Sequence, residues 1–126
     1  MKAYTDLSQS KKLTEILPLE SADMHYNNVS IKGINYVDEH RAELMEYNRA
    51  IKVLSKYTIN PLFEVVPCWS LAALLELIPN YNLSSEYHNH TCLANVFYGK
   101  EQVGWYDNPI DACAELILKL HELKML

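Results

Sequence analysis

The C-terminal segment 107–126 constrains the fold most, because it encodes a helix with one apolar side. Asp107 or Asn108 can cap its N-terminus, and Pro109 suits its first turn. Six residues recur on one face at helical spacing: Ile110, Cys113, Leu116, Ile117, Leu120 and Leu123. A helix of this length is marginal alone in water, so its apolar face needs a surface to pack against.

A β-hairpin over 91–106 is our candidate for that surface. Its centre is Gly99-Lys100, a Gly-X pair suited to a two-residue type II′ turn. The register set by this turn places two cross-strand pairs on one side of the ribbon: Val96 with Val103, and Ala94 with Trp105. We expect the terminal helix to pack on that side.

The rest of the chain gives further helix and strand signals. Apolar spacing and capping residues predict three more helices, over 5–17 (capped by Thr5 or Ser8), 38–57 and 71–78 (capped by Ser70). A short strand is indicated within 19–26, with a turn at 27–28. Residues 29–37 fit a short strand or an ordered loop, 62–66 fit a strand or an extended segment, and the polar segment 80–89 is typical of a loop.

These elements predict an α+β fold in a single domain, 1–126. Three or four helices pack on a small antiparallel sheet that contains the 91–106 hairpin. The chain of 126 residues is 49% apolar and 21% charged, which is typical of a globular domain. The strands do not alternate regularly with helices, which disfavours a parallel sheet.

The sequence also bears on localisation. It contains no run of 18 apolar residues, and its first residues include no apolar stretch typical of a signal peptide. Three cysteines, Cys68, Cys92 and Cys113, are an odd number, which favours reduced thiols. We therefore expect a cytoplasmic protein with no membrane partner.

Three segments, 1–24, 66–79 (VPCWSLAALLELIP) and 107–126, resemble a group of small uncharacterised proteins. These are encoded in gut Bacteroides-type bacteria, often in prophages and other mobile elements. The resemblance implies a compact helix–hairpin–helix unit in a bacterial cytosol, and it implies no activity, catalytic residue or ligand.

Four potential metal ligands alternate along one stretch: Glu86, His88, His90 and Cys92. On a single strand they would share a face, and imidazole with thiolate suits zinc. The alternative is that His88 and His90 belong to the polar loop while Cys92 begins the hairpin. Because no second pair of ligands is evident, we predict no cofactor and keep a metal site at His88, His90 and Cys92 as an alternative.

Catalytic signals are weak. Cys68 precedes a helix, whose N-terminus would lower the pKa of a thiol, but packing behind Pro67 and beside Trp69 is the favoured interpretation. Ser70 lacks the G-x-S-x-G context of a hydrolase nucleophile, and N-capping accounts for it. The sequence therefore leans away from an enzyme.

Aromatic residues suggest a protein interface. Tyr81 and Tyr87 fall in the polar segment, and Tyr106 and Phe97 are placed on the second face of the hairpin with Leu93. Exposed aromatic side chains of this kind are typical of protein–protein contacts. The alternative is that the N-terminal half covers this face.

Charge separates the remaining hypotheses. Residues 1–60 carry 8 basic and 8 acidic groups, whereas 61–126 carry 3 and 8. With no basic stripe, a nucleic-acid-binding factor is disfavoured. The function we favour is a non-enzymatic accessory protein that binds another protein or a second copy of itself. The alternative is a metal-binding module or metal-dependent enzyme.

Overall fold

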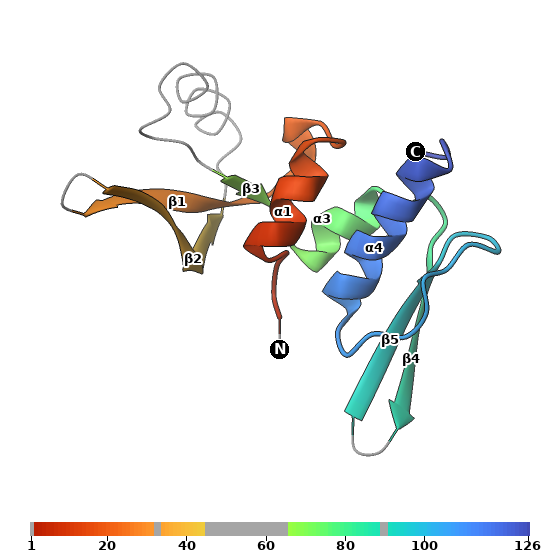
Figure 1. The fold of residues 1–126 in the computed structure, drawn as a ribbon. Helices are drawn as coiled ribbons and strands as arrows, with labels where there is room; N and C mark the ends of the chain where they lie inside the picture. The colour runs from red at the N-terminus through yellow and green to blue at the C-terminus, as the bar shows by residue number, and fades with distance from the viewer. Residues whose placement is uncertain (1, 32–33, 45–65, 89–90) are drawn as a thin grey trace. The chain divides into compact units, whose positions relative to one another are not determined.

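The computed structural model describes residues 2–31, 34–44, 66–88 and 91–126, and the side chains of all of these except 28–31, 34–41, 88 and 91. They form two compact units, Asp6–Trp69 and Met1–Thr5 with Ser70–Leu126. Within these ranges lie three α-helices and two small antiparallel sheets, which confirms the α+β class (Figure 1). The single domain expected over 1–126 stays a prediction.

The unit Asp6–Trp69 contains a helix and a three-stranded antiparallel sheet of order β2-β1-β3. Its elements are α1 (Leu7–Thr14), the 3-10 turn η1 (Leu19–Ser21), β1 (Met24–Ile31), β2 (Ile34–Leu44) and β3 (Val66–Cys68). The central strand, β1, pairs with β2 along most of its length and with β3 at its start.

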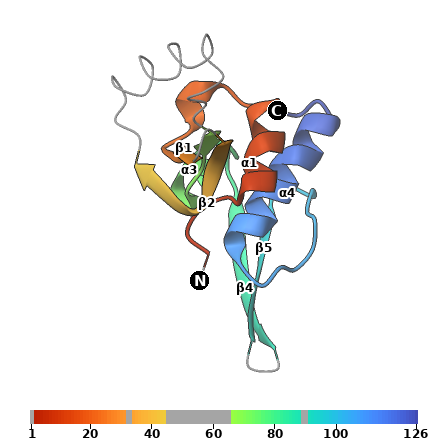
Figure 2. The ribbon, with the colours of Figure 1, turned by 60° about the vertical axis from the view of Figure 1, so that its left-hand side comes forward.

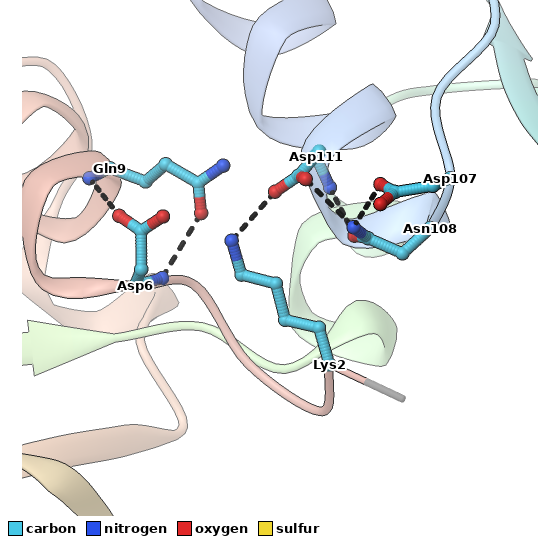
Figure 3. A network of polar contacts seen from close by, with 6 residues as sticks. All are labelled: Lys2, Asp6, Gln9, Asp107, Asn108 and Asp111. Carbon is cyan, nitrogen blue, oxygen red and sulfur yellow. Dashed lines mark hydrogen bonds and ion pairs between the residues drawn. The ribbon is translucent and has the colours of Figure 1, made fainter.

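Helix α1 begins with a reciprocal capping box (Figure 3). The Asp6 Oδ1 accepts from the Gln9 backbone N–H at 2.7 Å, and the Asp6 N–H donates to Gln9 Oε1 at 3.0 Å. The helix predicted over 5–17 is therefore confirmed for 7–14, but Asp6 caps it rather than Thr5 or Ser8. Asp6 is favoured because Gln9 lies three residues ahead and closes the box.

The helix predicted over 38–57 is wrong for 38–44, which belong to β2, and the remainder lies outside the described residues. The apolar spacing that predicted this helix begins at Leu44, so residues 38–43 contain no helical pattern that would disfavour a strand. The turn predicted at 27–28 is also wrong. The chain continues through β1 with a register shift between Tyr26 and Asn28.

Four fully or almost fully buried side chains, from α1, β1 and the end of β3, form the core of this unit: Leu13, Tyr26, Cys68 and Trp69. The Trp69 indole Nε1–H donates to Ser21 Oγ at 3.0 Å, which satisfies its polar group. Because α1 contacts β3, the sheet is covered by the helix near this cluster.

The second unit contains α3 (Leu71–Glu76), β4 (Asn82–His88), β5 (Thr91–Phe97) and α4 (Pro109–Glu122). Ser70 caps α3, as the sequence predicts. The loop predicted over 80–89 is wrong for 82–88, because β4 and β5 form an antiparallel ribbon, and residue 89 lies outside the described residues. Its polar composition concealed the alternation of a strand that is largely exposed to solvent.

Helix α4 begins as predicted, with Asn108 as N-cap and Pro109 in the first turn. The Asn108 Oδ1 accepts from the Asp111 N–H at 2.8 Å, and the Asp111 carboxylate pairs with Lys2 Nζ at 2.6 Å (Figure 3). The predicted apolar face is buried from Ile110 to Leu120. Leu123 is the exception, because the helix ends at Glu122 and leaves it 48% exposed.

Helix α4 contacts both β5 and α3. The turn at Gly99-Lys100 is confirmed, since Tyr98 and Glu101 exchange both backbone hydrogen bonds, at 3.0 and 2.9 Å. Gly99 has φ +59°, as a type II′ turn requires.

The predicted register of the 91–106 hairpin is wrong beyond this turn. Residues 101–106 form no strand, and Ala94 pairs with Tyr106 instead of Trp105. Gly104 has φ +103°, a backbone conformation that residues with a side chain rarely adopt. The segment 101–106 therefore contains one residue more than the strand opposite it. A slip of one residue reverses which face a side chain occupies, so Trp105 is 43% exposed instead of lying in the core.

Candidate functional site

Strand β4 lies at the edge of its sheet, as far as the described residues define that sheet. Among the strands that the structure describes, it pairs with β5 alone. The side of β5 that faces away from β4 is already hydrogen-bonded at Ala94, which pairs with Tyr106. An unpaired edge presents a row of N–H and C=O groups that can accept another strand.

The register identifies which backbone groups point outward from β4. The Ala94 N–H donates to the Tyr106 carbonyl at 2.7 Å, and the Tyr106 N–H donates to the Ala94 carbonyl at 2.9 Å. Ala94 therefore directs both of its groups away from β4, so Ala94 and its partner Ser85 form a non-hydrogen-bonded pair. The backbone groups of Ser85 point to the free edge. Because the pattern alternates, those of Leu83 and Tyr87 do too.

The side chains of the same residues are exposed. Leu83 is 44% and Tyr87 is 70% exposed, and Ser85 is also exposed. Directly opposed residues share a face, so Leu83 lies beside the fully buried Val96. Apolar surface thus continues from the core across β5 to the edge of β4.

The ribbon extends beyond the helix that contacts it. Figures 1 and 2 both show the end of β4 and the start of β5 projecting past the N-terminal end of α4. Tyr87 and Cys92, which pair near this end, are both exposed. A two-stranded ribbon is marginally stable without a further strand or a covering helix, so a further strand at this part of the unit would add stability.

The edge carries few of the features that block strand addition. Proteins commonly protect exposed edges with lysine, proline or bulges. Strand β4 has neither lysine nor proline, and its pairing with β5 is regular from Asn82 to His88. Apart from His88, the one residue of β4 that carries a charge near neutral pH is Glu86.

The four predicted interface residues differ in exposure. Tyr81 and Tyr87 are exposed, whereas Phe97 and Tyr106 are half-buried. The pairing with Ala94 places Tyr106 on the Ala94 face, opposite to the Phe97 face predicted for it. Whether these four contact a partner stays a prediction.

The pKa of the Tyr106 phenol reflects its partial burial and its position near two carboxylates of α4. Partial burial raises the pKa of its phenol, and the neighbouring carboxylates of Glu115 and Asp111 raise it further.

Leu83 and Ser85 belong to this edge and were missed by sequence reasoning. The sequence signal that could have identified them is the period-two spacing of Leu83, Ser85 and Tyr87, which is typical of a strand. The polar composition of the segment is equally typical of a loop.

The predicted metal ligands are only partly placed. His90 and the side chain of His88 lie outside the described residues. Cys92 is exposed and pairs with Tyr87, so Glu86 and Cys92 point to opposite faces of the ribbon and do not share the face expected of a continuous strand. Within the described part of the chain, no three His, Cys, Asp or Glu side chains are grouped to hold a metal. The metal site stays a prediction.

The remaining cysteines belong to the two cores. Burial raises the pKa of the Cys68 thiol to about 12, and the Asp23 carboxylate contributes. Burial alone raises the pKa of the Cys113 thiol to about 12. A nucleophilic cysteine needs a lowered pKa, so the packing interpretation of Cys68 is favoured.

No protein-family model, curated protein or solved structure matches this chain. The resemblance to Bacteroides-type mobile-element proteins is therefore an expectation from sequence alone. None of the helices described here is long and apolar enough to cross a membrane.

Proposed function

We propose that this protein acts by binding a partner chain, either another protein or a second copy of itself, which adds a β-strand to the edge of β4. The observation that carries the proposal is the outward direction of the backbone groups of Leu83, Ser85 and Tyr87, on a strand that has no second neighbour among the described residues. In strand addition, these main-chain groups supply affinity and the alternate side chains supply specificity.

The exposed side chains support this mode of binding. Leu83 and Tyr87 lie on one face, two residues either side of Ser85, and both are exposed. A strand added at the edge would cover part of each. It would also extend a two-stranded ribbon to three strands, the number from which sheets become stable on their own.

Photo-crosslinking tests the proposal directly. A photoreactive phenylalanine analogue replaces Tyr87 at the edge, and Glu122, exposed at the end of α4, receives the same analogue as a matched control. In cells that express the chain, position 87 is expected to give a discrete protein adduct and position 122 is not. Mass spectrometry of the adduct identifies the partner.

A second substitution links the adduct to the edge. Ser85→Pro removes an outward N–H but leaves the bonds between β4 and β5 intact, because proline is tolerated at such edge positions. The adduct at position 87 is expected to disappear in this variant. No adduct at position 87, or equal adducts at 87 and 122, would contradict the proposed function.

A further inference from the structure

We propose that the strand that completes β4 comes from a second copy of this chain, antiparallel and related by a two-fold axis at Ser85. This inference rests on the proposed function and specifies its partner. The residues whose backbone groups point outward, Leu83, Ser85 and Tyr87, are centred on Ser85, so two copies of β4 can pair antiparallel with all of these groups matched.

The two-fold register matches every outward group with another. Ser85 would face the partner's Ser85, and Leu83 would face the partner's Tyr87. Each of these is a pair of outward-directed residues, and such pairs exchange both of their N–H···O=C bonds. The register also uses the whole of β4, since Asn82 would face the partner's His88 at the ends.

The side chains fit the same register. Leu83 lies beside the buried Val96 in its own copy and would lie beside the partner's Tyr87 in the dimer. Aliphatic–aromatic pairs across strands are favourable, and this pair occurs twice because of the two-fold axis. The apolar strip would then run without interruption from one β5 to the other.

Charge and strand length favour an axis at Ser85 over an axis at either adjacent residue. With the axis at Ser85, Glu86 faces the partner's Ser84, which is neutral. An axis at Glu86 would place two carboxylates directly opposite one another, which is unfavourable. An axis at Ser84 would leave Tyr87 facing the partner's Tyr81, which precedes the strand.

The association closes at two copies. A two-fold interface uses the same patch on both chains and leaves it occupied. Further growth would need the outer side of β5, where Ala94 already exchanges both hydrogen bonds with Tyr106. The predicted assembly is therefore a dimer with a four-stranded sheet, β5-β4-β4-β5.

Paired charge substitutions at the axis test the register. Ser85 is exposed, so Ser85→Lys and Ser85→Glu are expected to leave the fold intact, which thermal unfolding followed by circular dichroism checks. Sedimentation equilibrium should show a wild-type dimer. Each variant alone should dissociate with a dissociation constant at least about tenfold higher, because two like charges meet at the axis. An equimolar mixture of the two variants should recover the dimer as a heterodimer.

Ser84→Lys is the matched control. It places the same lysine one residue away, where it faces the partner's Glu86, so its dimer should be as tight as the wild type or tighter. A dimer that resists both substitutions at Ser85, or a mixture that stays monomeric while each variant is folded, would overturn the inference.

The two proposals fail in different ways. A chain that is monomeric at every concentration, but whose photoreactive residue at position 87 captures a different protein, overturns the second copy as partner and leaves strand addition standing. A monomeric chain with no adduct at position 87 overturns both.

Discussion

Replacing Leu120 by alanine is expected to lower the free energy of unfolding by about 2–5 kcal/mol, the range for deleting a buried leucine side chain. Leu120 is fully buried on α4, which contacts β5 and α3, so the lost methyl and methylene groups leave a cavity there. Urea denaturation followed by circular dichroism measures the change.

Leu123→Ala is the matched control for this prediction. It removes the same atoms three residues later, where the side chain is 48% exposed and the helix has ended. Its expected effect is within about 0.5 kcal/mol. Equal losses in the two variants would mean that the apolar face of α4 does not form the core of its unit.

Alkaline pH is expected to destabilise both units through their buried thiols. The pKa values of Cys68 and Cys113 are raised from 9.0 to about 12 by burial. Above pH 9 the unfolded chain releases these protons while the folded chain retains them. The stabilisation is thus complete below pH 9 and is lost as the pH rises towards 12. Each thiol contributes a slope of about 1.4 kcal/mol per pH unit within that window.

Denaturation at a series of pH values from 8 to 11 tests this, with single alanine variants to isolate each cysteine. Cys113→Ala should lower stability at pH 8 and make its decline above pH 9 shallower by about 1.4 kcal/mol per unit. Cys92→Ala is the control, because the Cys92 side chain is exposed. An unchanged slope in Cys113→Ala would show that this thiol is not held neutral by the core.

The N-terminal starts of α3 and α4 could be predicted from sequence because their determinants are local. Ser70 and Asn108 each cap the backbone three residues ahead, and the apolar spacing of α4 needs no knowledge of its partner. Such signals span a single turn of helix, so a short stretch of sequence contains all of the information.

The strands were harder to predict because their determinants are distant in sequence. Residues 82–88 become a strand by pairing with 91–97, and 42–44 by pairing with β1, whereas their own composition is that of a loop or a helix surface. Trp105 is exposed because the pairing register shifts by one residue near Gly104. The alternation of apolar and polar residues in 101–106 does not reveal this shift. Propensity is a weak guide where pairing decides the outcome.

Of the three residues at the edge of β4, one was identified from the sequence. Tyr87 was identified because an aromatic residue in a polar segment is conspicuous. Leu83 and Ser85 were missed because their importance lies in the direction of their backbone groups, which depends on the bonds between Ala94 and Tyr106. That direction is a property of the register and is not encoded in any one residue type.

Hydrogen exchange of individual backbone amides tests the central claim, that the outer edge of β4 is completed by a partner strand. In the wild-type protein at high concentration, the amides of Leu83, Ser85 and Tyr87 should exchange slowly, and dilution below the dissociation constant should make them fast. The amides of Ser84 and Glu86, which face β5, should be protected under both conditions. Fast exchange at Leu83, Ser85 and Tyr87 at every concentration, with and without the protein captured at position 87, would contradict the account.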